Sequence, residues 1–255
     1  MTDTAHPTSP PRKLVAGNWK MHGLAGELEQ ARAVAEALAK EPARCRVAIF
    51  PPATLIHRMA EALSGGPVEI GAQDVHHAAR GAFTGDICAE MLRDAGATLV
   101  ILGHSERRGH HRESDVQVAA KVAAAISAGL EPLVCVGETL EQREAGEHID
   151  VVRRQVQESL PQSLDGRAFA VSYEPVWAIG TGLTPSIGEI EQMNAEIRQV
   201  LSDRFSEGGD VPILYGGSVK PSNAREILHA DGVGGALVGG ASLTAAEFLP
   251  IIRAA

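Results

Sequence analysis

The sequence predicts an α/β fold, a single (β/α)8 barrel, and three observations support this prediction. The chain has 255 residues, which is the usual size of one such barrel. Short apolar, β-branched runs alternate with longer segments of helical periodicity, a pattern typical of βαβ units and a parallel sheet. This alternation repeats eight times without a linker or a break in composition, which favours one closed barrel over two domains.

The eight candidate strands cover residues 14–19, 46–50, 68–73, 98–103, 133–137, 169–173, 213–215 and 235–238. Each is followed by a segment in which apolar side chains recur on one helix face. Two such sets are Leu28, Ala31, Ala35 and Leu38, and Ile190, Met193, Ile197 and Val200. A doubly wound open sheet is the alternative, but no G-x-G-x-x-G follows the first strand, so its dinucleotide-binding form lacks its signature.

The charge and hydropathy of the chain exclude two classes of binding partner. The formal net charge is -9, and no basic stripe or polybasic cluster is present, so neither nucleic acid nor a membrane surface is an expected partner. No apolar run reaches the ~18 residues that a membrane span requires. A positively charged pocket for an anionic substrate must therefore be a local feature of the chain.

The beginning of the chain differs from the rest. Residues 1–12 are rich in Thr and Pro and have no apolar core, so they are predicted to be a disordered leader and not a signal peptide, with residues 13–255 as the single folded domain. Cys45, Cys88 and Cys135 are few and odd in number. They are expected to be reduced, buried thiols, which predicts a cytoplasmic protein.

Polar residues and glycines follow directly after six of the predicted strands, at 18–20, 103–108, 137–138, 174–182, 216–218 and 239–240. The carboxyl ends of all eight strands of a barrel meet at one rim, where such barrels place their chemistry. The sequence therefore predicts a single site at that rim.

Two titratable residues at this rim suit acid–base chemistry. Glu174 comes at the end of the sixth strand, directly before Pro175, and is a candidate general base; the alternative is a solvated loop acid. His104 follows the fourth strand, where Ser105 and Glu106 predict the start of a short helix. A helix N-terminus favours a neutral imidazole that donates a hydrogen bond; the alternative is a structural histidine.

The same rim has features suited to an anion. Lys20 closes the first strand and is the candidate cation, although a lone lysine is more often a solvated surface charge. Glycine pairs follow strands seven and eight, where barrels commonly bind phosphate through backbone N–H groups. The pairs are Gly216 with Gly217 and Gly239 with Gly240, and Ser218 adds a hydroxyl donor. The adjacent histidines at 76–77 and 110–111 lack metal-ligand spacing, so no metal is expected.

Eight short motifs resemble those of the triosephosphate isomerase family, in the family's order. They are GNWK at 17–20, GAQD at 71–74, GAFTG at 81–85, GHSERR at 103–108, CVGE at 135–138, YEPVWAIGTG at 173–182, YGGSV at 215–219 and VGG at 238–240. The resemblance runs from residue 14 to residue 252. It implies a TIM barrel that interconverts dihydroxyacetone phosphate and D-glyceraldehyde 3-phosphate through an enediolate, in glycolysis and gluconeogenesis, without a cofactor.

The resemblance also implies a role for each matching residue. Glu174 is the base that moves a proton between C1 and C2, and His104 is the neutral electrophile. Lys20 stabilises the enediolate, and Glu106 supports Lys20. The residues implied to bind substrate are Asn18, Lys20, Gly180, Ser218, Gly239 and Gly240, and residues 175–184 are implied to form a mobile lid.

The motif at 81–85 resembles a loop that inserts into a second subunit, which implies a homodimer with Thr84 at the contact. Two departures from the family pattern affect these secondary features: a shortened Leu183-Thr-Pro185 segment after the lid, and Asp86 in place of the usual glutamate. Two alternative functions use the same motifs, a tetrulose-phosphate isomerase and a catalytically silent phosphate-binding barrel. The presence of Glu174, His104 and Lys20 together argues against the silent barrel.

Overall fold

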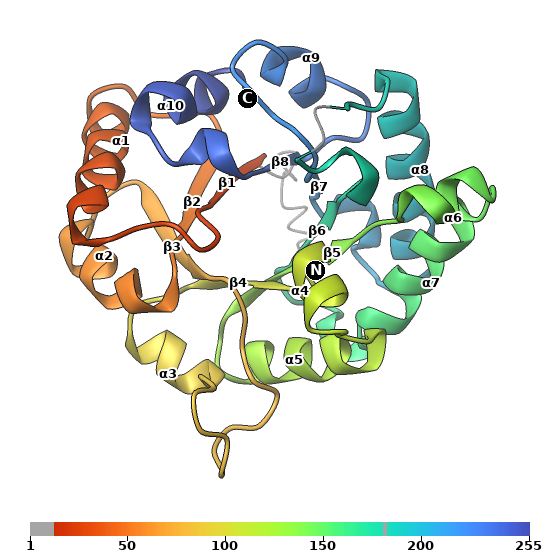
Figure 1. The fold of residues 1–255 in the computed structure, drawn as a ribbon, viewed down its shortest axis with the longest axis horizontal. Coiled ribbons are helices and arrows are strands. Elements are labelled where there is room, and N and C mark those ends of the chain that lie inside the picture. The colour runs from red at the N-terminus through yellow and green to blue at the C-terminus, as the bar shows by residue number, and fades with distance from the viewer. Residues whose placement is uncertain (1–12, 181–182) are drawn as a thin grey trace, which may run out of the picture.

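The computed structural model describes residues 13–180 and 183–255, so the predicted leader at 1–12 lies outside the described residues. Eight parallel strands pair in sequence order, and the last, β8, pairs with the first, β1, which closes the sheet. Helices surround this closed sheet (Figure 1). The prediction of a (β/α)8 barrel is therefore confirmed, and the open sheet is excluded.

All eight predicted strands form, with small shifts at their ends. The strands are β1 (Leu14–Asn18), β2 (Arg46–Phe50), β3 (Val68–Ala72), β4 (Leu99–Leu102), β5 (Glu131–Val136), β6 (Ala170–Tyr173), β7 (Ile213–Tyr215) and β8 (Gly235–Val238). β5 begins two residues before the predicted start because the Glu131 N–H already donates to the carbonyl of Thr98 at 2.9 Å. Pro132 lies near the start of the strand, where a missing N–H is tolerated. β4 ends before Gly103, whose φ of 66° takes the backbone out of the extended region.

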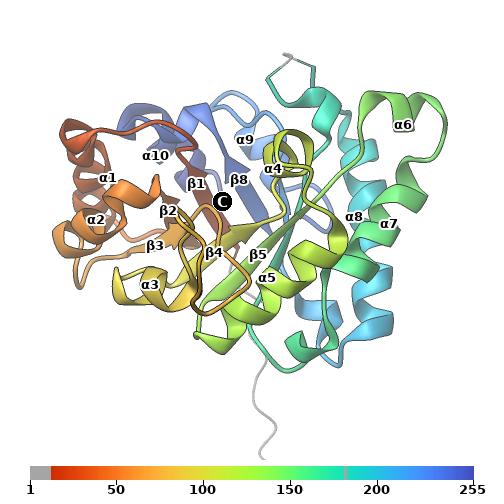
Figure 2. The same cartoon turned by 60° about the horizontal axis from the view of Figure 1, so that its bottom comes forward.

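The helices run back along the outside of the barrel, as Figure 2 shows for α5, α7 and α8. They are α1 (Leu28–Lys40), α2 (Ile56–Ala62), α3 (Ala89–Asp94), α4 (Ser105–His110), α5 (Asp115–Ser127), α6 (Leu140–Glu144), α7 (His148–Ser159), α8 (Ile187–Arg204), α9 (Ala224–Leu228) and α10 (Ala245–Arg253). The two apolar sets predicted from periodicity are buried on α1 and α8. No helix in the described part of the chain is long and apolar enough to cross a membrane.

Side chains along each strand point alternately into and out of the barrel, and this divides the apolar core into two clusters. One cluster fills the interior of the barrel and consists of Leu14, Ala16, Ala48, Phe50, Leu99, Ile101, Leu133, Cys135, Ala170, Leu214 and Leu237. Their neighbours along each strand, such as Val15, Val47 and Val100, point outward and pack in a larger cluster beneath the helices. The interior is thus solid, so a ligand site must lie at an end of the barrel.

Candidate functional site

A cavity of about 520 Å³ lies at the carboxyl ends of the strands. Seven of the predicted site residues line it: Asn18, Lys20, His104, Gly180, Ser218, Gly239 and Gly240. Glu106 instead lines a neighbouring cavity of about 720 Å³ that shares Asn18, Lys20 and His104 with the first. The single rim site predicted from the strand ends is therefore where these side chains meet.

Lys20 has a backbone conformation that is uncommon for a residue with a side chain. Its φ is 53°, in the left-handed region. Two neighbours hold it there: its N–H donates to Oδ1 of Asn18 at 2.9 Å, and its carbonyl accepts from Nε2 of Gln73 at 2.9 Å. Its Nζ lies 2.6 Å from Oε1 of Glu106. Asn18 and Gln73 thus fix the Lys20 backbone, and Glu106 holds the ammonium group at the cavity wall.

His104 is the N-cap of α4, and its ring nitrogens have different partners. Nδ1 accepts a hydrogen bond from the backbone N–H of Glu106 at 3.2 Å. An N–H can only donate, so Nδ1 carries no proton and the neutral ring has its proton on Nε2. Nε2 lies 3.1 Å from Oε1 of Glu174. The imidazole therefore presents its Nε2 donor toward Glu174.

Glu174 lies one residue beyond β6 and is only 1 % exposed, so it is not the solvated loop acid of the alternative interpretation. Its Oε2 accepts from the backbone N–H of Ser105 at 2.8 Å, whereas Oε1 accepts no hydrogen bond of good geometry from the described residues. Glu174 does not line the cavity in this structure. Its carboxylate must turn away from Ser105 to reach a ligand there.

Two glycines make room for Glu174. A Cβ atom at Gly137 would lie 1.7 Å from the carbonyl oxygen of Glu174, and a Cβ at Gly216 would lie 2.7 Å from its Cγ. A side chain at Gly137 would displace the backbone of Glu174, and one at Gly216 would displace its side chain. Beneath it lies the buried thiol of Cys135, whose pKa is raised well above its usual value by burial and then by the negative charge of Glu174. Cys135 therefore stays protonated, and the carboxylate has a neutral neighbour.

Glu138 is a fully buried carboxylate that sequence reasoning did not assign to the site. Its Oε1 accepts from the Trp177 indole N–H at 2.8 Å and from the Tyr173 hydroxyl at 3.1 Å, and Arg143 lies 3.2 Å away. Burial and then the Glu138 charge raise the pKa of Tyr173. Trp177 belongs to the short 3-10 turn Val176–Ala178 that follows Glu174. Glu138 thus fixes the beginning of the segment that was predicted to be a lid.

The glycine-rich turns after β7 and β8 form the other side of the cavity. Gly217, Ser218, Gly239 and Gly240 all line it, with Gly180 nearby in the chain segment after β6. The Ser218 hydroxyl donates to the carbonyl of Ala178 at 3.1 Å, which joins this wall to the segment after β6. Of the predicted lid, residues 181 and 182 lie outside the described residues.

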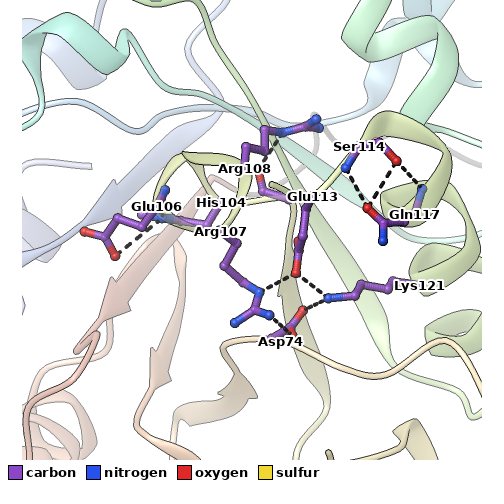
Figure 3. Close-up of polar contacts among 10 residues, drawn as sticks. Asp74, His104, Glu106, Arg107, Arg108, Glu113, Ser114, Gln117 and Lys121 are labelled. Carbon is purple, nitrogen blue, oxygen red and sulfur yellow. Dashed lines mark hydrogen bonds and ion pairs between the residues drawn. The ribbon is translucent and has the colours of Figure 1, made fainter. Parts of the chain in front are cut away.

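An ion-pair cluster supports the wall next to His104 (Figure 3). Arg107 contacts Asp74 at 2.8 Å and Glu113 at 2.6 Å, and Lys121 lies 2.6 Å from each of the same two carboxylates. The carboxyl end of β3 is thereby joined to α4 and α5.

Thr84 lies outside this cluster and both cavities, in an exposed loop between β3 and α3 that projects beyond the ring of helices (Figure 1).

Three residues that matter to the geometry were not predicted as site residues: Gln73, Ser105 and Glu138. Gln73 and Glu138 lie within motifs at strand ends, which is the signal that could have found them. Ser105 acts through its backbone N–H on a residue 69 positions away, and no side-chain pattern reveals such a contact.

Comparisons with known proteins agree with this geometry. The sequence profile of the triosephosphate isomerase family matches residues 13–255. A triosephosphate isomerase of Caulobacter vibrioides is 61% identical over 245 residues, which covers 96% of this chain and 97% of the relative. One of Ruegeria pomeroyi is 54% identical, with 95% and 97% covered. The crystal structure of triosephosphate isomerase from Bartonella henselae superimposes with a TM-score of 0.89 at 44% identity, covering 95% of this chain and 98% of the other. The chain therefore belongs to the triosephosphate isomerase family.

Proposed function

We propose that the cavity at the carboxyl ends of the strands is the active site of this isomerase, in which Glu174, His104 and Lys20 act together on a triose phosphate. As a member of the family, the enzyme interconverts the ketose dihydroxyacetone phosphate and the aldose glyceraldehyde 3-phosphate. The observation that carries the assignment of roles is the approach of His104 Nε2 to Glu174 Oε1, 3.1 Å apart, beside a cavity that Lys20 also lines.

The proposed reaction begins with proton removal from C1 of the ketose by Glu174. The C–H electron pair forms the C1–C2 double bond, and the carbonyl π pair moves to the oxygen on C2. His104 Nε2–H donates to the developing oxyanion, and the Lys20 ammonium stabilises its charge, the type of stabilisation that contributes most in water-excluded sites. The proton of the C1 hydroxyl passes to the oxygen on C2, with His104 Nε2 as the relay. As Glu174 returns the carbon-bound proton to C2, the C1–C2 π pair forms the new C2–H bond and an electron pair on the C1 oxygen forms the aldehyde C=O, which gives the aldose. All atoms and electrons balance within the substrate.

Substrate binding is proposed to involve the opposite wall. The backbone N–H groups of Gly180, Ser218, Gly239 and Gly240 would hold the phosphate, and Asn18 would contact the substrate near Lys20. Residues 175–184 would act as the lid, with Glu138 holding Trp177 and Ser218 holding Ala178 at its beginning. Glu106 would keep Lys20 in place.

The alternative function, isomerisation of tetrulose phosphates, would need the same groups. The relatives named above are triosephosphate isomerases, so this alternative is not favoured.

Glu174→Asp tests the base. The substitution withdraws the carboxylate by roughly 1 Å, and misplacement on that scale costs about 100-fold in rate. The phosphate wall is unchanged, so we expect kcat to fall about 100-fold while KM changes less than about tenfold. Steady-state assays with glyceraldehyde 3-phosphate and with tetrulose phosphates measure both the role and the substrate. Glu36→Asp, on the exposed face of α1, is the matched control. A near-normal kcat for Glu174→Asp would remove Glu174 from the chemistry.

We further propose a cytoplasmic homodimer in which the loop at 81–85 enters a second subunit. The support is a projecting loop, with Phe83 43% exposed, and a 720 Å³ cavity beside Lys20 of suitable position to receive it. The resemblance implies that residue 86 pairs with Arg107 of the other subunit. Arg107 is already engaged by Asp74 and Glu113 of its own chain, so the shorter Asp86 should weaken the dimer little. The three cysteines are buried and free, which suits a reducing compartment.

Thr84→Arg tests the dimer. A bulky charge at this position would be buried without a partner on assembly, which costs several kcal/mol, so we expect monomers with reduced activity. Sedimentation velocity reports the change. Thr244→Arg, an exposed threonine at the N-cap of α10, is the control for the added charge. A dimeric, fully active Thr84→Arg would place the interface elsewhere.

A further inference from the structure

The proposed phosphate cavity carries few formal charges. Among the described residues that line it, the lysines and carboxylates are Lys20, Lys220 and Glu247. Lys20 lies 2.6 Å from a Glu106 oxygen, so its charge already has a partner. The whole chain carries a net charge of -9, and the long-range field of such a protein repels a phosphate dianion. Capture of substrate therefore depends on local positive charge at the mouth of the cavity.

Lys220 is the cation without a counter-ion in this group. It is exposed, lines the same cavity as Gly239 and Gly240, and follows Ser218 by only two residues. Within the described chain it takes part in no ion pair. An ammonium group in this state keeps its full charge for an approaching anion, screened only by solvent and salt.

The backbone that carries Lys220 is fixed beside the proposed phosphate wall. Its N–H donates to Oδ1 of Asn223 at 2.8 Å, and Nδ2 of Asn223 donates to the carbonyl of Ser218 at 3.1 Å. One asparagine thus holds both Ser218 and Lys220 in a single turn. The flexible side chain of Lys220 therefore begins from a fixed point at the cavity mouth.

Glu247 has the opposite sign on the same cavity. It is exposed in the first turn of α10 and forms no ion pair with the described residues. A free carboxylate at this mouth raises the energy of an approaching dianion, as a like charge does at any binding surface. The two residues allow the effect of one charge to be tested with either sign.

We propose that Lys220 supplies the unneutralised positive charge that captures the substrate phosphate, and that Glu247 opposes it. This inference rests on the proposed phosphate site. Lys220 acts before the chemical step, on the approach and binding of the dianion, and takes no part in proton transfer. It is a specificity-determining residue for phosphorylated substrates and not a catalytic one.

The test compares kcat/KM for glyceraldehyde 3-phosphate across ionic strength in five proteins: the parent, Lys220→Gln, Lys220→Arg, Glu247→Gln and Lys40→Gln. At about 10 mM salt we expect Lys220→Gln to lose about three- to tenfold in kcat/KM, with kcat within about twofold. Near 0.3 M salt, where screening acts over roughly 6 Å, the loss should shrink to under about twofold. Lys220→Arg should restore the parent value, and Glu247→Gln should raise kcat/KM about twofold at low salt.

Lys40→Gln is the control for net charge. Lys40 is exposed at the end of α1, which runs away from the site, and its loss changes the total charge by the same unit. We expect no change in its salt profile relative to the parent. A Lys220→Gln profile parallel to those of the parent and Lys40→Gln would overturn the proposal, as would failure of Lys220→Arg to restore activity.

Competition by inorganic phosphate separates this inference from the site assignment. If phosphate competes with substrate in the parent and its inhibition constant rises for Lys220→Gln but not for Lys40→Gln, the proposal is supported. If phosphate competes equally well in all five proteins, only the role of Lys220 fails. If phosphate competes in none of them, the phosphate site itself is wrong and the role of Lys220 fails with it.

Discussion

The two ends of the barrel both carry charged side chains, but they use them differently. At the amino end, the guanidinium of Arg46 donates two hydrogen bonds to Glu69 and two to Glu131, all at 2.8 or 2.9 Å. These three residues lie at or near the first residues of β2, β3 and β5 and satisfy one another. At the carboxyl end, Oε1 of Glu174 and the hydroxyls of Ser172 and Tyr215 are buried without a hydrogen-bond partner in the described chain.

Buried polar atoms that lack partners cost stability, so an arrangement that keeps them indicates a use for them. The same eight strands thus separate two tasks. The amino end of the strands binds its charges into a closed network that favours the folded state. At the carboxyl end, by contrast, buried polar atoms stay unpaired and two lysines, Lys20 and Lys220, line the cavity. Substitutions at the two ends should therefore change different measured quantities.

Lys20→Met should have the largest effect, and on activity alone. Loss of one group that stabilises an oxyanion costs about 100- to 1,000-fold in rate, and Lys20 contributes a full charge, so we expect a loss near 1,000-fold in kcat. The melting temperature should change little because the Lys20 side chain is 29% exposed and its ion-pair partner Glu106 is 45% exposed. Steady-state kinetics and thermal denaturation measure both quantities, with Lys40→Met as the control. Retention of more than about a tenth of the activity, a loss under ~1.4 kcal/mol, would contradict the proposed role.

Arg46→Met should give the reverse result. It leaves Glu69 and Glu131 close together without their cation, and the pairs are partly buried. The cost should fall between that of an exposed and a buried ion pair, about 2 kcal/mol, with kcat/KM within about twofold of the parent. Arg253→Met breaks an exposed pair with Glu41 and should cost under about 0.5 kcal/mol. Urea denaturation compares the two variants. A large loss of activity in Arg46→Met would show that the two ends are not independent.

Glu113→Gln should sharpen the comparison with the smallest effect, because it lies in an ion-pair cluster at the otherwise open carboxyl end. Burial raises the pKa of Glu113, but Lys121 and Arg107 together outweigh burial and hold the pKa below 4.5. A lowered pKa stabilises the fold above pH 4.5, and this contribution is lost as pH falls through the folded-state pKa.

The Glu113→Gln variant should be about 1 kcal/mol less stable than the parent at pH 7, the net value of a typical hydrogen bond. Denaturation at a series of pH values should show this difference shrinking as the pH is lowered below 4.5. The exposed Glu36→Gln should show no such convergence. A constant difference between Glu113→Gln and its parent would mean that the carboxylate charge is not the source of the effect.

The sequence predicted the barrel because each strand and helix has a local apolar period that its burial imposes. It also predicted which residues reach the rim, since position after a strand decides that in a parallel barrel. It did not predict the direction of the Glu174 carboxylate, which depends on the Ser105 N–H and on space left by Gly137 and Gly216. These groups come from three other strand ends. Contacts of this kind depend on register and turn geometry, which no local period encodes.

The left-handed backbone of Lys20 has a consequence for selection. A lysine in this region is strained by about 1 kcal/mol or more, whereas glycine or asparagine adopts it at little cost. A library screened only for thermal tolerance would therefore enrich Gly or Asn at position 20. Those survivors would melt later and turn over almost no substrate. Heat resistance must therefore evolve through substitutions at other positions, because relieving the strain at position 20 also abolishes the activity.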